Sequence, residues 1–461
     1  MATVVISPGQ DEKPISSYDE LLSPFHAAIK PPSAFRCGAE MEKFGVLSNG
    51  VPIGYEGSHG VRALMEELAA NKGWVQETES EGSPLIALLR NGASITLEPG
   101  SQFELSGTAF DNCHQIRDEL EEHLAELGPF SERHGIRWLG VGFHPFARRG
   151  DYTSIVPKQR YSIMREYLPT RGSHALDMML RTATVQANYD YSSEQDAMTK
   201  MRVALRLSPL TTAIFANSPF YEGMPFGGKS YRAKIWLDTD PDRSGLVPAL
   251  WKKSATFVDY VEWALDVPMF MFLRNGQKVA NTGQTFRSFW KSGFRNHRPT
   301  LFDWLTHLNT LFPEVRLKKT IEVRGADSQS IELSCALPAL YTGIFNDARA
   351  LAEADAFTQD WTLDEVTALR KEVWQKGLFA RFRAGTLVPL AERLIEIAEG
   401  GLERRAILSL VGKDERVHLA PLKDLVSHGQ TPADRLIEGL DRAADMRAEI
   451  LVRTDLIGRS V

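Results

Sequence analysis

The sequence predicts an α+β protein that combines helices with an antiparallel β-sheet polar on one face. Two observations support this class. Across about residues 35 to 324, short segments alternate polar and apolar side chains with the period of two that a strand requires, and helical stretches lie between them. From about residue 338 onward, apolar residues recur with helical spacing. We therefore expect an N-terminal segment, residues 1–34, followed by one large domain, residues 35–461, whose C-terminal part is helical.

Five segments show the strand-like alternation: residues 37–44, 94–104, 183–191, 230–236 and 320–324. Their polar positions are Glu40, Glu42, Glu98, Gln102, Glu104, Gln186, Asn188, Arg232, Lys234, Glu322 and Arg324. A half-buried antiparallel sheet explains this alternation, because one of its faces packs on the core. The other face either lies in water or lines a binding site. The gathering of carboxylates with amides favours the binding site.

The helices are predicted from capping residues and apolar spacing. Residues 112–127 and 193–206 are expected to be helices of the first part. In the C-terminal part, Thr362 with Glu365 forms a capping box ahead of an apolar-periodic run, and residues 389–400 have helical spacing. Pro432 is expected at the first position of a further helix. This helical part is expected to pack on the sheet-containing body.

The composition excludes several classes of protein. The 461 residues are 43% hydrophobic, which is enough to bury a large core. A net charge of -6 without a long basic run argues against a nucleic-acid partner. The three cysteines, Cys37, Cys113 and Cys335, lack the spacing of a zinc site and are typical of a reducing compartment. Charged residues near the N-terminus and the lack of a long apolar run argue against a leader or membrane span, so a cytoplasmic location is expected.

The polar face is predicted to hold metal ions, because five glutamates would share it: Glu40, Glu42, Glu98, Glu104 and Glu322. Close carboxylates repel each other by about 1 kcal/mol per pair in water and by roughly 4 kcal/mol at an effective dielectric constant of 20. A cation should therefore lie among them, and oxygen ligands favour Mg²⁺ or Mn²⁺ over zinc. Since Mg²⁺ also binds phosphate oxygens, the face is expected to bind a nucleoside triphosphate, with Arg324 neutralising phosphate charge.

A second phosphate-binding pattern is present in residues 223–230, which satisfy the expression G-x-x-x-x-G-K-S. A true P-loop is followed by a helix that points at the phosphates. Residues 231–237 are instead predicted to be a strand rich in Tyr, Ile and Trp. Lys229 is therefore not expected to bind phosphate, although a P-loop kinase or ATPase remains an alternative.

Several motifs, in order along the chain, resemble those of plant-type glutamate-cysteine ligases. Residues 38–45 resemble the G-x-E-x-E-K-F-G opening of this family, residues 96–107 its LEPGxQFELSG segment and residues 178–188 its MMxRTxTVQxN strand. Residues 216–220, 235–243, 264–269 and 311–327 are also similar to family segments. The resemblance extends over roughly residues 35 to 445, too far for chance agreement.

The resemblance implies a glutamine synthetase-like fold, in which a curved antiparallel sheet forms a funnel with helices packed outside. It implies formation of γ-glutamylcysteine from glutamate and cysteine through γ-glutamyl phosphate, the first step of glutathione biosynthesis, with ATP as co-substrate and two or three Mg²⁺ ions. A monomer or weak homodimer is expected. The alternatives are a related ligase that uses another acceptor amine, and a nucleotide- or metal-binding regulatory protein without catalysis.

The same resemblance implies roles for individual residues. Arg324 matches an arginine that contacts phosphate, and Arg232 one that grips glutamate, so these two are the candidate catalytic residues. Gln186 and Asn188 lie near the nucleotide. The implied magnesium ligands are Glu40, Glu42, Glu98, Glu104 and Glu322. Cys335 matches one cysteine of a regulatory disulfide, but Cys113 lies about one helical turn from the partner position, so this disulfide is not expected.

Overall fold

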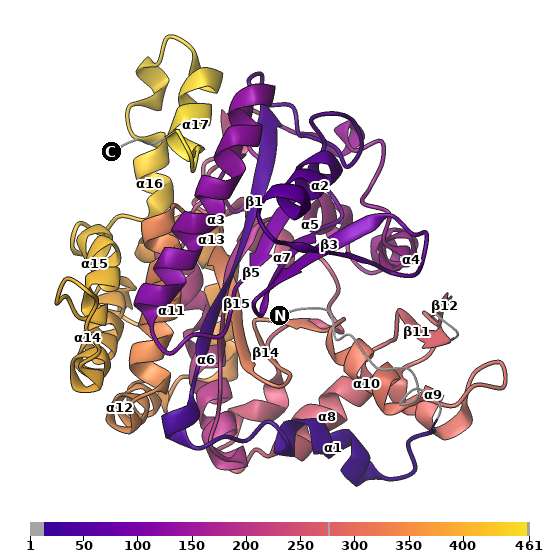
Figure 1. Ribbon diagram of the computed structural model, residues 1–461. Helices are drawn as coiled ribbons and strands as arrows, with labels where there is room; N and C mark the ends of the chain where they lie inside the picture. The colour runs from indigo at the N-terminus through magenta and orange to yellow at the C-terminus, as the bar shows by residue number, and fades with distance from the viewer. Residues whose placement is uncertain (1–12, 275–276, 459–461) are drawn as a thin grey trace.

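The computed structural model describes residues 13–274 and 277–458 (Figure 1). Residues 1–12, on which the expectation of no leader partly rested, lie outside this part of the chain. Within it, no helix is both long enough and apolar enough to cross a membrane.

An antiparallel β-sheet forms the centre of the fold. Its strands are β1 (Cys37–Leu47), β2 (Val75–Thr78), β3 (Leu85–Arg90), β4 (Ala93–Leu97), β5 (Phe103–Ser106), β6 (Ile136–Leu139), β7 (Thr184–Tyr189), β14 (Val315–Leu317) and β15 (Ile321–Asp327). The strands follow the order β14-β15-β7-β1-β5-β4-β3-β2, and β6 pairs with the end of β1. For the described residues the sheet is open, since β14 and β2 are its two ends. The α+β prediction is confirmed.

The strand register places on one face the predicted polar residues that lie in the strands, namely Glu40, Glu42, Glu104, Gln186, Asn188 and Glu322. Glu42 lies opposite Glu104 of β5, and Glu40 lies between Ser106 and Gln186 of the neighbouring strands. On the other face the side chains are apolar. The pairs there include Met41 with Leu105, Met41 with Val185, and Ala187 with Val323. Side-chain alternation along the strands was therefore predicted correctly.

The helices of the first part are α1 (Tyr18–His26), α2 (Val61–Asn71), α3 (Cys113–His134), α4 (Gln159–Tyr167), α5 (Ala175–Arg181), α6 (Glu194–Ile214), α7 (Tyr231–Trp236), α8 (Phe257–Asp266), α9 (Phe286–Ser292) and α10 (Leu301–Leu308). Those of the second part are α11 (Ile331–Phe345), α12 (Ala348–Thr358), α13 (Leu363–Lys376), α14 (Val388–Arg405), α15 (Ala420–Ser427), α16 (Pro432–Ile437) and α17 (Met446–Thr454). Short strand pairs connect some of them: β8 (Phe220–Tyr221) with β9 (Met224–Pro225), β10 (Ser244–Gly245) with β13 (Phe312–Pro313), β11 (Met271–Arg274) with β12 (Gln277–Ala280), and β16 (Arg381–Phe382) with β17 (Gly385–Thr386).

Helices α3, α6 and α11 pack on the sheet. Figure 1 shows α3 and α11 beside β1; α11 contacts β1 and β7, while α6 contacts β14 and β15. From Leu333 onward, every residue of α11 is buried. The C-terminal helix α14 packs on α11, and α13 packs on α6. The helical tail therefore covers the layer that supports the sheet, as predicted.

Capping residues mark several helix starts. The side chains of Asn112 and Ser193 accept hydrogen bonds from the first turns of α3 and α6. Thr362 forms the predicted capping box with Glu365, and Thr431 forms one with Asp434 ahead of Pro432. The helical part begins earlier than predicted, at Ile331 rather than near residue 338, and is interrupted by the β16–β17 hairpin.

One predicted strand is wrong, because residues 231–236 form helix α7. Its cap is the Ser230 hydroxyl, which accepts a hydrogen bond of 3.0 Å from the backbone N–H of Ala233. The apolar pair Tyr231 and Ile235, four residues apart, is buried on one side of the helix. In a segment this short, apolar residues satisfy both the strand and the helix period, so alternation alone does not distinguish them.

All three cysteines are buried free thiols. Cys113 interacts with Cys37 rather than with Cys335, and the hydrogen bond between the Cys37 and Cys113 thiols, together with burial, raises the pKa of Cys113 well above its ordinary value. Burial raises the pKa of Cys335 to about 12. The thiols of Cys113 and Cys335 are therefore poor nucleophiles at neutral pH, whereas the same hydrogen bond from Cys113 lowers the pKa of Cys37.

Candidate active site

Three glutamates form an acidic cluster on the polar face of the sheet: Glu42 on β1, Glu104 on β5, and Glu98 in the turn between β4 and β5. Burial raises the pKa of Glu42 well above its ordinary value, and the carboxylates of Glu98 and Glu104 raise it further. Burial, Glu40 and Glu98 raise the pKa of Glu104. Carboxylates that raise one another's pKa in this way are poised to take up positive charge.

Neutral hydrogen-bond donors position the acidic cluster. The backbone N–H of Thr184 donates to Glu42 Oε2 at 3.0 Å, and the hydroxyls of Thr96 and Ser106 donate to Glu104 at 2.6 and 2.9 Å. No Lys or Arg of the described chain forms an ion pair with either of these two glutamates. The negative charge of Glu42 and Glu104 is therefore not balanced by an adjacent side chain.

The turn that carries Glu98 depends on close backbone packing. The N–H of Glu98 donates to the carbonyl of Gln102 at 2.9 Å, which closes the turn. A Cβ atom at Gly100 would lie 2.3 Å from the carbonyl oxygen of Leu180, so only glycine fits there. The Gln102 side chain secures the turn by donating to the carbonyls of Met179 and Thr182.

A basic cluster of Arg316, Lys318 and Arg324 surrounds Glu322 at the other side of the face. Arg316 donates to both carboxylate oxygens at 2.8 and 3.0 Å, Lys318 Nζ lies 2.7 Å away, and Arg324 also contacts the carboxylate. Burial acts to raise the pKa of Glu322, yet the three cations hold it well below its ordinary value. The cations predicted among the carboxylates are thus partly supplied by the protein.

Glu40, Gln186 and Asn188 lie between the two clusters. Asn188 Nδ2 donates to Glu40 Oε1 at 2.8 Å, and Arg324 Nη1 donates to Gln186 Oε1 at 2.6 Å. The register of β7 with β1 and β15 puts Gln186 opposite Glu40 and Asn188 opposite Glu322. All the predicted site residues of these strands therefore share one face. In the described chain, however, no three His, Cys, Asp or Glu side chains meet closely enough to hold an ion on their own.

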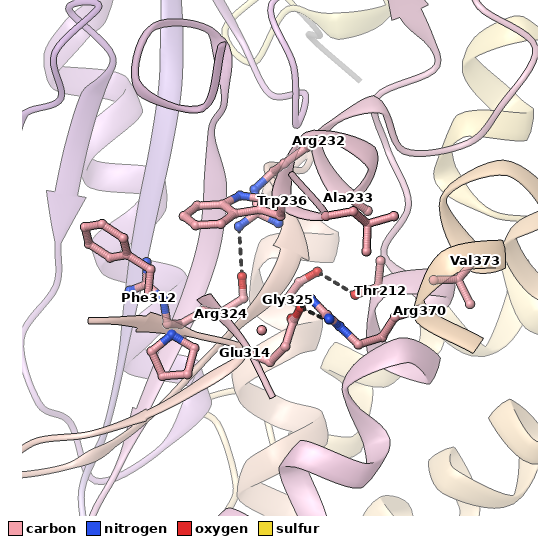
Figure 2. A pocket seen from close by; sticks show the side chains of 13 residues that line it. Thr212, Arg232, Ala233, Trp236, Phe312, Glu314, Arg324, Gly325, Arg370 and Val373 are labelled. Atoms are coloured by element: carbon pink, nitrogen blue, oxygen red, sulfur yellow. Dashed lines mark hydrogen bonds and ion pairs between the residues drawn. The ribbon is translucent and has the colours of Figure 1, made fainter. Parts of the chain in front are cut away.

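A pocket adjoins this face at Arg324 (Figure 2). Arg232 reaches it from α7 and donates to the backbone carbonyl of Arg324 at 3.0 Å. Glu314 and Arg370 lie on the opposite side of the pocket in Figure 2, and the rings of Trp236 and Phe312 form part of the wall. Burial lowers the pKa of Arg232, and the carboxylates of Asp327, Glu42 and Glu314 oppose that effect. Arg232 is thus within electrostatic reach of both the pocket and the acidic cluster.

Asp327, at the end of β15, holds the start of α7. Its carboxylate accepts hydrogen bonds from the Ser218 hydroxyl at 2.7 Å and the Ser230 hydroxyl at 3.0 Å, and Arg232 Nη1 lies 3.9 Å away. Arg232 therefore lies at the pocket, where a helix presents it and not the strand predicted from the sequence. Lys234, which the strand prediction put on the same side as Arg232, lies against the rings of Tyr231 and Trp374.

Sequence reasoning missed five side chains of this region: Glu314, Arg316, Lys318, Asp327 and Arg370. A signal was present for two of them, because Arg316 and Lys318 alternate around Leu317 and so share a strand face. Arg370 lies on a helix 56 residues from its partner Glu314. Only the folded chain brings these two together.

Backbone donors at the end of the P-loop-like segment are already occupied. The N–H groups of Lys229 and Ser230 both donate to the carbonyl of Trp374, at 2.8 and 2.9 Å. Lys229 Nζ pairs with Asp434 at 2.5 Å. A helix does follow the segment, contrary to the prediction, but its first turn is capped by Ser230. The occupied donors and the pairing of Lys229 with Asp434 therefore disfavour phosphate binding, although no strand follows the segment.

Replacing Lys229 with alanine should leave phosphate release within a few-fold of the unmodified protein at saturating ATP. The loss of the pair with Asp434 should lower stability by about 1 kcal/mol or less, because both side chains are partly exposed. Lys423→Ala, which breaks the surface pair with Glu399, is the matched control. Loss of ATP turnover in Lys229→Ala alone would establish the P-loop alternative.

An acidic cluster and a basic cluster on one sheet face, with an arginine-lined pocket beside it, together define an enzyme site for negatively charged substrates. Known proteins identify the enzyme further. The model of the family described as glutamate-cysteine ligase family 2 matches residues 36–451. The chain belongs to this family, and the resemblance seen in its motifs is confirmed.

Two curated relatives are named chloroplastic glutamate–cysteine ligases. The one from Brassica juncea is 42% identical over 443 residues, which is 94% of this chain and 84% of that protein. The one from Medicago truncatula is 42% identical over 430 residues, 92% of this chain and 82% of that protein. The expected cytoplasmic location is therefore wrong by this comparison. Composition and cysteine usage reflect a reducing environment and do not distinguish one such compartment from another.

A solved structure has a similar fold. The crystal structure of a glutamate–cysteine ligase from Francisella tularensis in complex with AMP aligns with a TM-score of 0.57 and 14% identity, covering 91% of this chain and 87% of that one. At this level of identity the likeness concerns the arrangement of helices and antiparallel sheet.

Proposed function

We propose that this protein is an ATP-dependent glutamate–cysteine ligase that joins the γ-carboxylate of glutamate to the amino group of cysteine. The observation that carries the proposal is that the segment matched by the family, residues 36–451, contains the acidic cluster and the basic cluster on one continuous sheet face, with the pocket adjoining it at Arg324. Relatives at 42% identity bear the name of this activity. In this proposal, the polar face is the wall of the funnel expected from the glutamine synthetase-like fold.

The two arginines have separate tasks in the proposed reaction. The glutamate γ-carboxylate attacks the γ-phosphorus of ATP, which forms γ-glutamyl phosphate and ADP. The amine of cysteine then attacks the acyl carbon, loses a proton and displaces phosphate. Arg324, with Gln186 and Asn188 beside it, neutralises the charge that develops on the phosphoryl oxygens. Arg232 binds a carboxylate of glutamate from the pocket side.

The proposed magnesium ligands are Glu40, Glu42, Glu98, Glu104 and Glu322. An all-oxygen donor set fits Mg²⁺, which when bound neutralises the triphosphate and orients it. The acidic cluster fits best, because its buried carboxylates raise one another's pKa. Glu322 fits an ion less well, because it already contacts three cations, among them Arg324.

The proposed function is tested by phosphate release from ATP with Mg²⁺ and glutamate across a panel of acceptor amines. The panel contains cysteine, 2-aminobutyrate, alanine, glycine and no amine, and mass spectrometry identifies the product. Cysteine should give the fastest release and a product of the mass of γ-glutamylcysteine. Faster turnover with another amine would establish the related ligase instead, and no turnover with any amine would contradict the proposal.

A further inference from the structure

The pocket beside Arg324 contains a carboxylate that the reaction described above does not use. Glu314 lies between β13 and β14, and its backbone is held from both sides: its N–H donates to the carbonyl of Gly245 at 2.8 Å, and its carbonyl accepts from the N–H of Arg324 at 3.2 Å. These two bonds fix the backbone of Glu314 next to the backbone of β15. The Glu314 side chain is then one wall of the pocket, as Figure 2 shows.

Arg370 on α13 holds only one oxygen of this carboxylate. Its Nε and Nη2 donate to Glu314 Oε1 at 3.0 and 2.5 Å. Within the described chain no group donates a hydrogen bond to Oε2. This second oxygen borders Gly325, where an added Cβ would lie 3.3 Å from both Glu314 Oε2 and Thr212 Oγ1. Glycine at this position therefore keeps open the space in front of the uncommitted oxygen.

The charges around the pocket match a zwitterion. Arg232, Arg324 and Arg370 are cationic, whereas Glu314, whose Oε1 pairs with Arg370, is anionic, and both signs are present among the residues that line one small pocket. A purely anionic ligand, such as phosphate, would pair with Arg232 and Arg324 but would offer no hydrogen-bond donor to Glu314 Oε2. An α-amino acid satisfies both ends, because its carboxylate pairs with a guanidinium and its ammonium donates to a carboxylate.

We propose that Glu314 Oε2 accepts a hydrogen bond from the α-ammonium group of the donor amino acid, and that Arg370 is the positioning residue that turns this oxygen toward the pocket. The inference rests on the proposed function and adds to it the basis of selectivity: the site takes an α-amino acid and rejects the dicarboxylate that lacks the amine. Arg232 binds the carboxylate of the same head group. Arg370 acts through Glu314 and does not itself touch the substrate.

The test compares glutamate with glutarate, which has the same two carboxylates and no amine. In Glu314→Gln, the KM for glutamate should rise about ten- to a hundredfold, the size of one lost charge-assisted hydrogen bond. The Ki of glutarate as a competitor should stay constant or fall, since the opposing negative charge is removed. The KM for ATP should not change. Arg370→Met should also raise the KM for glutamate, by a smaller factor, without raising the Ki of glutarate. The KM for glutamate of the double variant should be no higher than that of Glu314→Gln.

The matched control is Glu396→Gln, which breaks an exposed pair with Arg393 on α14 and should change none of these constants. If Glu314 and Arg370 were only structural, glutamate, glutarate and ATP would all bind more weakly together, and that result would overturn the inference. Should Glu314→Gln fail to fold, Glu314→Asp is the substitute, because it withdraws the carboxylate by one methylene. It should raise the KM for glutamate without raising the Ki of glutarate. A wild-type protein inactive with glutamate would instead refute the proposed function.

Discussion

Replacement of Glu42 by glutamine should abolish product formation and at the same time stabilise the ligand-free protein. Glu42 is buried beside two other carboxylates, without an ion pair to it in the described chain, so its ionised form destabilises the fold. Glutamine keeps the shape and removes the charge that the proposed magnesium site needs. We expect turnover to fall by at least about a hundredfold and the unfolding free energy without ligands to increase by roughly 1 kcal/mol.

Phosphate release and thermal unfolding, with and without Mg²⁺ and ATP, measure the two effects. The raised pKa of Glu42 also sets the sign of a pH dependence: stability gained from its protonated form is present at low pH and disappears as pH rises through the folded-state pKa. The stability advantage of Glu42→Gln should therefore widen from acidic to neutral pH. A variant that is active, or less stable than wild type without ligands, would contradict the acidic cluster as a cation site. Glu396→Gln is again the control.

Replacement of Arg324 by methionine should lower kcat by roughly a hundred- to a thousandfold, because a fixed cation next to the reacting phosphate is lost. Arg324 is partly buried, contacts Glu322 and Gln186, and lines the pocket, so it lies at the junction of both proposed substrate sites. The protein should remain folded, since Arg316 and Lys318 still neutralise Glu322. Steady-state kinetics with each substrate varied in turn measures the effect.

Arg316→Met is the matched comparison for this prediction. Arg316 pairs with the same carboxylate, but its remaining hydrogen bonds go to the backbone carbonyls of Asn309 and Leu311 rather than toward the pocket. We expect it to lower the unfolding temperature more than Arg324→Met does and to lower kcat less. Equal kinetic losses in the two variants would show that Arg324 acts only by supporting Glu322.

The strand faces and helix caps of this protein are determined by its sequence alone. Glu40, Glu42 and Glu104 share a face because side chains alternate along a strand whatever the strand packs against. The capping box of Thr362 with Glu365 is equally local, since it needs only residues three apart. The segment that includes Gln186 and Asn188 predicted a strand by its side-chain alternation. Its residues also resembled a motif of the family.

The tertiary structure decided the rest. Segment 231–236 is too short for its apolar period to distinguish a strand from a helix, and the Ser230 cap with buried Ile235 makes it a helix. The pairing of Arg370 with Glu314 and the enclosure of Glu322 by cations depend on distances between separate segments, which local patterns do not encode. The sequence therefore determined which side chains of the strands share the polar face, whereas the packing of distant elements determined which other side chains join them, which charges are balanced there and which oxygen is left for a substrate.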